Sequence, residues 1–245
     1  LGPYKVVSEL GAGGFATVFK AIVEGELGFE RQVALKVLHA HVTKDDPDIV
    51  KMLADEARLM ALMQHPNIVY VQWFGQLDHP DEGRVFAMLM EFVQGRTLRS
   101  LLEEGRRDDS PLPLGVLLDV YLDVARALAF AHALKDSFGV PLGLVHRDLK
   151  PDNVMVSAQG VVKLLDFGIA KATGRLASKT ATDMVRGTVQ YMSPEQVKGA
   201  KDVDFRSDLF SFGAMLYEAI TGARLIDAET VIAALHQVAS FQSDQ

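Results

Sequence analysis

The sequence predicts an α+β protein with two unequal parts, the first rich in strands and the second mainly helical. Segments with alternating or β-branched residues, typical of strands, surround one helix in the first hundred residues. After about residue 112, helical periodicity dominates, with short strands in between. The two patterns meet in the segment 91–95, which we expect to be a hinge between a part of about residues 1–91 and a part of about residues 96–245.

Composition narrows the chemistry further. The 245 residues can bury a sizeable core, and the absence of cysteine excludes disulfides, thiolate metal sites and thiol nucleophiles. A net charge of −7, without any long run of Lys and Arg, argues against a nucleic acid or an anionic membrane as partner. Charged residues interrupt every long apolar stretch, so no membrane-spanning segment is expected. We expect a cytoplasmic domain that is a piece of a longer protein. Whether a membrane anchor lies outside these residues is left open.

A glycine-rich turn joins the first two predicted strands, 6–10 and 17–23. Its glycines, Gly11, Gly13 and Gly14, allow backbone N–H groups to approach phosphate oxygens. Ordinary hairpin turns have the same composition, so the turn alone is weak support for a phosphate site. Because a strand follows it rather than a helix, it does not fit a dinucleotide-binding loop or a Walker loop.

A helix is predicted to begin after Asp46, with Pro47 in its first position. Its apolar face consists of Ile49, Met52, Leu53, Leu59, Met60 and Met63. Glu56 falls in the middle of that face, where a carboxylate is costly unless it is paired. Lys36, on the predicted strand 31–38, also lies among apolar residues, so we expect the two to pair. The alternative is that Lys36 reaches solvent and Glu56 merely ends the apolar face.

The strongest chemical signal lies in two polar loops beside short apolar strands, at 145–154 and 164–168. Their chemically useful side chains are Asp148, Lys150, Asn153 and Asp166. Such groups supply a base, a cation that neutralises phosphate, and oxygen ligands for a hard metal ion. A polar turn explains either loop alone, but it does not explain both in this order and spacing.

Together with further motifs, these loops resemble the catalytic domain of protein kinases, and more narrowly the eukaryotic-like Ser/Thr kinases of bacteria. The matching segments cover residues 4–222 in family order and are 11–18, 33–36, 65–69, 90–93, 146–153, 166–168, 187–188, 191–195 and 207–208. The resemblance implies a two-lobed kinase fold over residues 1–245: a small N-lobe with an antiparallel sheet and one helix, and a larger, mainly helical C-lobe.

The resemblance implies that ATP is the nucleotide substrate. In the family, the glycine-rich loop covers the phosphates, a strand lysine contacts the α- and β-phosphates, and a helix glutamate holds that lysine. Lys36 and Glu56 match these two residues. Hinge residues offer backbone groups to adenine, and apolar side chains sandwich its ring. The ATP-binding residues implied in this way are Gly11, Ala12, Gly13, Gly14, Phe15, Ala16, Val18, Ala34, Lys36, Met90, Glu91, Val93 and Met155.

The resemblance also implies the catalytic roles. Asp148 orients the substrate hydroxyl and accepts its proton, while Lys150 balances charge on the phosphoryl group. Asn153 and Asp166 hold two Mg²⁺ ions, for which Mn²⁺ is an expected substitute. Lys150 together with Thr188 resembles the Ser/Thr class rather than the Tyr class, so protein Ser and Thr hydroxyls are the expected acceptors.

Regulation is expected from Arg147, a cation beside the catalytic aspartate that a phosphate on a nearby loop would suit. Thr180 and Thr182 have the spacing to Gly187 of the threonines that bacterial relatives autophosphorylate. We expect phosphorylation of one or both to order this loop. A plain polar surface loop is the alternative. Self-association for autophosphorylation in trans is an expected interaction of this chain with itself.

The sequence departs from the family in two places. Ala16 replaces the third glycine of the phosphate loop, which predicts altered nucleotide affinity rather than loss of binding. The helix predicted at 205–222 is apolar nearly all round and is therefore expected to be fully buried. Only about 23 residues follow Gly222, so the final helices that cover this helix in the family are expected to be missing. Either the C-lobe is truncated, or a partner or second copy covers that surface.

Two other functions stay open beside the protein kinase. A pseudokinase that holds nucleotide and serves as a scaffold generally loses some of Lys36, Glu56, Asp148, Asn153 and Asp166, all of which are present here. A small-molecule kinase of the aminoglycoside or choline type generally lacks the segment 187–195. Both comparisons favour a protein kinase.

Overall fold

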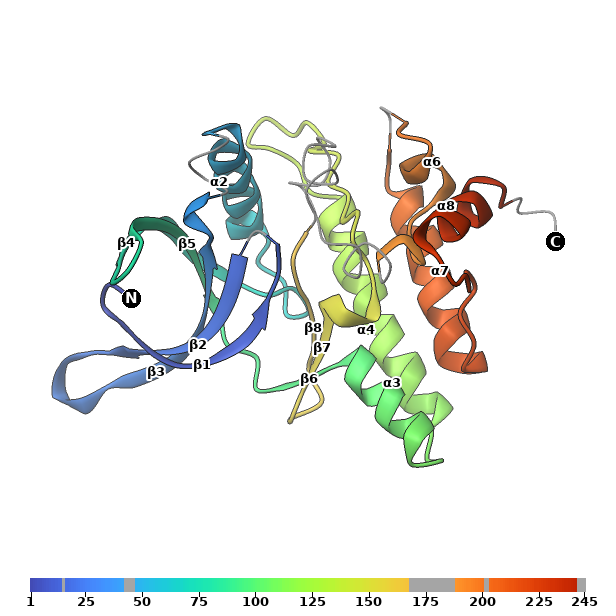
Figure 1. Ribbon diagram of the computed structural model, residues 1–245, viewed down its shortest axis with the longest axis horizontal. Coiled ribbons are helices and arrows are strands. Elements are labelled where there is room, and N and C mark those ends of the chain that lie inside the picture. Colours follow the sequence, from blue (N-terminus) through green and yellow to red (C-terminus); the bar gives the residue numbers. More distant parts are fainter. Residues whose placement is uncertain (15, 42–46, 168–187, 201–202, 242–245) are drawn as a thin grey trace. The chain divides into compact units, whose positions relative to one another are not determined.

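The computed structural model describes residues 1–14, 16–41, 47–167, 188–200 and 203–241 (Figure 1). The chain forms two compact units. Unit 1 consists of Leu1–Gln64 and Val69–Gln94, and unit 2 consists of His65–Ile68 and Gly95–Gln245. The change from one unit to the other after Gln94 falls inside the segment 91–95. An antiparallel sheet in unit 1 and a mainly helical unit 2 confirm the predicted α+β class.

Unit 1 is built on a five-stranded antiparallel sheet with the order β1-β2-β3-β5-β4 (Figure 1). The strands are β1 (Tyr4–Ala12), β2 (Ala16–Glu24), β3 (Glu30–Leu38), β4 (Val71–His79) and β5 (Gly83–Glu91), with a 3₁₀ turn, η1 (Glu26–Gly28), before β3. Val33, Leu35 and Val37 alternate along β3 and enter the core of the unit, as the two-residue period of a strand requires.

One helix, α2 (Pro47–Leu62), packs against β4. Its predicted first residue is confirmed, whereas Asp46 and the side chains of Ile49 and Met52 lie outside the described residues. On its buried face are Leu53, Glu56, Ala57 and Met60, at spacings of three and four residues. Glu56 is therefore a buried carboxylate, as the helical period predicts.

Unit 2 contains the helices α3 (Leu98–Arg107), α4 (Leu114–His132), α6 (Pro194–Val197), α7 (Arg206–Thr221) and α8 (Val231–Ala239). A small antiparallel sheet has the order β6-β7-β8, with β6 (Gly95–Thr97), β7 (Val154–Ser157) and β8 (Val162–Leu164), and a 3₁₀ turn, η2 (Pro151–Asn153), leads into β7. The long α4 packs against β8 and α7. None of the described helices is long and apolar enough to span a membrane.

A short excursion of the chain, His65–Ile68, belongs to unit 2 because it is bonded to β8. The Asn67 amide donates to the carbonyl oxygen of Val162 at 3.0 Å, and the Leu164 N–H donates to the carbonyl oxygen of Asn67 at 2.8 Å. Asn67 is buried, so these bonds replace contacts with water. Ile68 pairs in parallel with Leu164 beside them.

The expectation that the helix at 205–222 is fully buried is wrong for α7. Leu209, Tyr217 and Ile220 are exposed, and Ile220 keeps 56% of its surface. The side chains of α7 that are buried are mostly polar or small: Ser207, Asp208, Ser211, Ala214, Met215 and Glu218. An all-round apolar pattern predicts burial on every side only when another layer is present, and the described residues provide none over this face.

We expect Asn67→Ala to destabilise the protein by about 1–3 kcal/mol, because it leaves the buried carbonyl of Val162 without its donor. Thermal or urea unfolding, followed by circular dichroism, measures this loss. The exposed Gln159→Ala, at the turn between β7 and β8, is the control and should unfold like the wild type. Equal stability of the two variants would contradict the importance of the Asn67 bond.

Candidate active site

The loop that carries Asp148 is fixed by apolar residues on both sides of it. Leu144 and Val145 are buried before the loop, Leu149 is buried inside it, and Val154 is buried where β7 begins. The buried residues fix the course of the backbone, and thereby the positions of the polar side chains between them. Asp148 and Asn153 are each 9% exposed, so their polar groups act in surroundings with little water.

Three of the predicted residues meet around the Asp148 carboxylate. The Asn153 amide nitrogen donates to the Asp148 backbone carbonyl at 2.8 Å and to its carboxylate oxygen Oδ2 at 3.1 Å. The Lys150 ammonium lies 3.4 Å from the same oxygen and donates to the Thr188 hydroxyl at 3.0 Å. The carboxylate is therefore oriented by an amide and a cation, and Thr188 holds that cation in place.

Asp166 follows Leu165, the residue just after β8, which is bonded to the Asn153 backbone. The Leu165 N–H donates to the Asn153 carbonyl oxygen at 2.8 Å, which brings the end of β8 beside η2. Asp166 itself is half-buried and has a φ of 34°, in the left-handed region that an Asp adopts at moderate cost. The two predicted oxygen ligands, Asn153 and Asp166, thus belong to one bonded part of unit 2.

His146 links these two loops through its ring. Burial lowers the pKa of His146 below its ordinary value, so the ring is neutral at pH 7. The Leu165 carbonyl can only accept, so Nε2 carries the proton and donates to it at 2.9 Å, while Nδ1 accepts from the Asp148 N–H at 3.3 Å. The ring also packs against Phe167, with 4.6 Å between ring centres.

Asp208, near the start of α7, holds the backbone of the Asp148 loop. Its fully buried carboxylate accepts from the His146 N–H at 2.8 Å and from the Arg147 N–H at 2.9 Å. The ring of His132 donates to it as well, at 2.8 Å. Asp208 belongs to the matching segment 207–208, but this role was not predicted from the sequence. An acidic residue inside an apolar helix is the signal that could have found it.

The short helix α6 adds a second clamp on the same loop. Ser193 and Gln196 form a reciprocal capping box at its first turn. The Gln196 amide nitrogen then donates to the Arg147 carbonyl oxygen at 2.9 Å. Both backbone groups of Arg147 are thus bonded, and this residue has a φ of 64°.

In unit 1 the predicted phosphate loop is a tight hairpin. The Gly13 N–H donates to the Ala16 carbonyl oxygen at 2.8 Å, and Gly11 stands opposite Val18 in the β1–β2 register. Ala16 is buried where β2 begins, opposite Leu38, so its methyl group is accommodated in the sheet. Phe15 lies outside the described residues.

Most of the other residues implied for ATP lie on neighbouring strands of unit 1. Val93 lies in the segment after β5, and Met155 lies on β7 of unit 2. Lys36 is half-buried on β3, opposite Val18 on β2 and Met88 on β5. Ala34 and Met90 are buried and face each other across the register. The pairing of Lys36 with Glu56 stays a prediction, which the burial of Glu56 supports.

At the hinge, the Glu91 N–H donates to the Tyr70 carbonyl oxygen at 3.0 Å. The Glu91 carboxylate also accepts from the Tyr70 N–H, at 2.8 Å. The Glu91 N–H is therefore engaged inside unit 1.

The donor set of unit 2 fits a hard divalent cation. The Asn153 side chain donates both of its hydrogen bonds to Asp148 through its amide nitrogen, which leaves its amide oxygen to serve as a ligand. No group of three or more His, Asp and Glu side chains in the described part of the chain could hold a metal ion alone. Phosphate oxygens of a nucleotide would have to complete the coordination, as is usual for Mg²⁺.

This combination of fold and site defines the class of a protein kinase, and the comparisons with known proteins agree. The protein kinase domain family matches residues 4–244, so the chain belongs to the protein kinase family. It is a catalytic domain of the eukaryotic-like type that bacteria possess. Kinases of this family use ATP with a divalent metal ion.

Several bacterial kinases resemble the chain over most of its length. The tyrosine-protein kinase MasK of Myxococcus xanthus is 44% identical over 235 residues, which are 96% of this chain and 35% of MasK. The serine/threonine-protein kinase PknA of Mycobacterium tuberculosis is 40% identical over 91% of this chain and 48% of PknA. PknB of Mycobacterium leprae is 38% identical over 89% of this chain and 32% of PknB. The chain thus spans about a third to a half of the length of these relatives.

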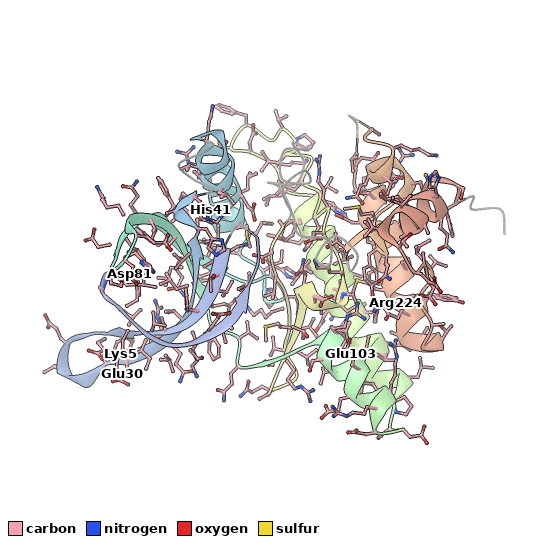
Figure 2. All side chains as sticks on the ribbon, viewed as in Figure 1. Lys5, Glu30, His41, Asp81, Glu103 and Arg224 are labelled. Atoms are coloured by element: carbon pink, nitrogen blue, oxygen red, sulfur yellow. The ribbon has the colours of Figure 1, made fainter. Side chains whose placement is uncertain are left out.

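A second buried ionic group in unit 2 was not predicted from the sequence. We call it the Glu218 cluster, and it consists of Arg99, Arg106, Tyr191, Glu218 and Arg224. The Glu218 carboxylate is fully buried and lies 2.9 Å from Arg99, 3.3 Å from Arg106 and 3.6 Å from Arg224. Burial raises the pKa of the Tyr191 phenol, which therefore stays protonated and donates to Glu218. Figure 2 labels Arg224, which follows α7.

The Glu218 cluster predicts a defined dependence of stability on pH. Burial alone raises the pKa of Glu218, but the bond from Tyr191 and the charge of Arg99 outweigh it, so the pKa lies below its ordinary value. A carboxyl with a lowered folded-state pKa stabilises the protein above its unfolded-state pKa of about 4.3, and this stabilisation is lost as pH falls further. Glu218→Gln should therefore cost about 3 kcal/mol at pH 7 and flatten the loss of stability below pH 5.

Urea unfolding of this variant and the wild type at several pH values between 3 and 7 measures both effects. Glu103→Gln is the matched control, because Glu103 lies 3.9 Å from the same Arg99 but is exposed (Figure 2). Parallel acid curves for Glu218→Gln and the wild type would contradict a lowered pKa of Glu218.

Proposed function

We propose that this domain transfers the γ-phosphate of ATP to Ser and Thr hydroxyls of proteins. The observation that carries the proposal is the arrangement of Asp148, Lys150 and Thr188, in which one cation bridges the carboxylate and a hydroxyl of the segment before α6. The names of PknA and PknB, which are serine/threonine-protein kinases, support Ser and Thr as acceptors.

Tyrosine is the second candidate acceptor, because the relative MasK carries the name tyrosine-protein kinase at 44% identity. The motif evidence favours Ser and Thr. Lys150 and Thr188 resemble the Ser/Thr class, and in the structure they are hydrogen-bonded to each other.

The residues of unit 2 suit the chemistry of this transfer. The oxygen of the substrate hydroxyl forms a bond to the γ-phosphorus of ATP while Asp148 accepts the proton of that hydroxyl. The bond from the γ-phosphorus to the bridging oxygen breaks, and ADP leaves with that oxygen. Lys150 neutralises charge on the moving phosphoryl group. Asn153 and Asp166 would hold Mg²⁺, or Mn²⁺ in its place, which when bound neutralises the phosphates. The chain itself supplies position and charge rather than covalent chemistry.

The unit 1 residues support the same proposal on the nucleotide side. We assign to the hairpin between β1 and β2 the covering of the phosphates, and to Lys36, held by Glu56, the contact with the α- and β-phosphates. The hinge groups of Glu91 and Val93 would hold adenine, with Met90 as gatekeeper. An ATP-consuming domain of this kind is expected in the cytoplasm.

The test is phosphate transfer from radiolabelled ATP to peptides that differ only in a Ser, Thr or Tyr acceptor. Asp148→Asn should lower the transfer rate by about 10²–10⁴-fold, because it removes the proton acceptor. Nucleotide binding, measured with a fluorescent ATP analogue, should persist. Asp119→Asn, on the exposed face of α4, is the control and should retain wild-type activity.

Other outcomes of this assay would overturn parts of the proposal. Label on the Tyr peptide alone would replace Ser and Thr as acceptors. Nucleotide binding without any transfer by the wild type would favour a pseudokinase scaffold. Transfer to small hydroxyl compounds but to no peptide would favour a small-molecule kinase.

We further propose that phosphorylation of Thr180 or Thr182 activates the domain, with Arg147 as the partner of the phosphate. Both threonines lie outside the described residues. Arg147 supports the idea because its backbone is held on both sides beside Asp148. We also propose transient self-association, through which one copy phosphorylates another.

Replacing both Thr180 and Thr182 by Ala should lower peptide phosphorylation by about tenfold, which corresponds to loss of one or two charge-assisted bonds. Steady-state kinetics on protein preincubated with ATP measures this effect, and Ser178→Ala in the same segment is the control. Arg147→Gln should add little to the double Ala variant if the phosphate and the guanidinium act as a pair. Full activity of the double variant would refute this mode of regulation.

A further inference from the structure

Arg99 differs from the other two arginines of the Glu218 cluster. Its side chain is 13% exposed, against 37% for Arg106 and 39% for Arg224. Beyond Glu218, it donates to the Tyr191 hydroxyl, lies 5.7 Å from the centre of the Tyr191 ring, and reaches Asp152 at 3.5 Å. Within the described ranges, the guanidiniums of Arg106 and Arg224 contact neither Tyr191 nor Asp152.

One set of these contacts leads to the cation of the active site. The Tyr191 N–H donates to the Thr188 carbonyl oxygen at 3.2 Å, which closes a turn, and the Thr188 hydroxyl accepts from Lys150 at 3.0 Å. The Ser211 hydroxyl of α7 holds the Tyr191 carbonyl oxygen at 2.6 Å. With its ring, hydroxyl and backbone all fixed, Tyr191 sets the position of Thr188 and thereby of the Lys150 ammonium.

The other contact leads to the amide that orients Asp148. Asp152 precedes Asn153 in η2. The Asn153 amide nitrogen donates to the backbone carbonyl oxygen of Asp148 and to its carboxylate oxygen Oδ2. Asp152 is half exposed, so its pair with Arg99 contributes little to overall stability. The importance of this pair lies in the segments that it connects rather than in its energy, because it links α3 to η2, the turn that carries Asn153.

We propose that Arg99 is a positioning residue for phosphoryl transfer, which acts through Tyr191 and Thr188 on Lys150 and through Asp152 on Asn153. This inference rests on the proposed kinase function. A guanidinium can serve Glu218, Tyr191 and Asp152 together because it has five N–H donors in one rigid plane. An ammonium has one point of charge and could replace only the pairing with Glu218.

The experiment compares Arg99→Gln, Arg99→Lys and the matched control Arg106→Gln in the 245-residue chain. Arg99→Gln should lower kcat for peptide phosphorylation by about ten- to a hundredfold, because misplacement of catalytic groups by less than 1 Å has effects of this size. KM for ATP should stay within about twofold. Arg106→Gln should keep kcat within about twofold, since it removes a contact to the same Glu218 without touching Tyr191 or Asp152. Arg99→Lys should restore stability but not kcat.

A readout that does not depend on activity completes the design. Amide hydrogen exchange of the turn 188–191 should be faster in Arg99→Gln than in Arg106→Gln at matched temperature below unfolding. The proposal is overturned if kcat falls in proportion to lost stability in both variants, if Arg99→Lys restores full kcat, or if the turn is equally protected in all variants. Absence of transfer by the wild type would instead refute the kinase function, and the exchange data would still decide whether Arg99 holds the turn.

Discussion

Two fully buried carboxylates on α7, Asp208 and Glu218, are the constraint on which the rest of the active site in unit 2 depends. Burying a carboxylate costs several kcal/mol unless hydrogen bonds and cations satisfy it. In both cases the donors include segments that are bonded to the residues proposed for catalysis. Asp208 accepts from the backbone of the Asp148 loop and from His132. Glu218 is paired with the arginines of α3 and with Arg224, and it accepts from Tyr191. Burial of Asp208 and Glu218 therefore requires that the segments with their donors lie against α7.

The spacing of the two carboxylates suits this task. Ten residues of α-helix separate them, which is about 15 Å along the helix axis. One rigid helix thus reaches the loop that carries Asp148 and also the turn that holds Thr188. The same bonds explain how the left-handed conformation of Arg147 persists. Such a residue costs about 1–3 kcal/mol, and here its N–H and its carbonyl are both bonded, to Asp208 and Gln196.

Periodicity predicted the features that depend on neighbours along the chain. The buried position of Glu56 follows from a 3.6-residue repeat, and the alternation of β3 follows from a repeat of two. The meeting of Asp148, Lys150 and Asn153 follows from their short separation. The Glu218 cluster could not be predicted in this way, because Arg99 and Arg106 are more than a hundred residues away from Glu218. The exposed side of α7 was mispredicted for a related reason: a pattern on one helix does not report whether another layer covers it.

The residues proposed for nucleotide binding in unit 1 and those proposed for phosphoryl transfer in unit 2 are thus held by different physical means. In unit 1, Lys36 is placed by strand register, because a slip of one residue between β2 and β3 would turn its side chain to the other face of the sheet. This register depends on apolar packing and on the turn between β2 and β3, which is closed by the Gly25 N–H donating to the Phe29 carbonyl oxygen at 2.7 Å. Both are insensitive to pH near neutrality. In unit 2, Lys150 and Asn153 are placed by buried charges whose balance requires ionised Glu218. Acid should therefore loosen the residues proposed for catalysis in unit 2.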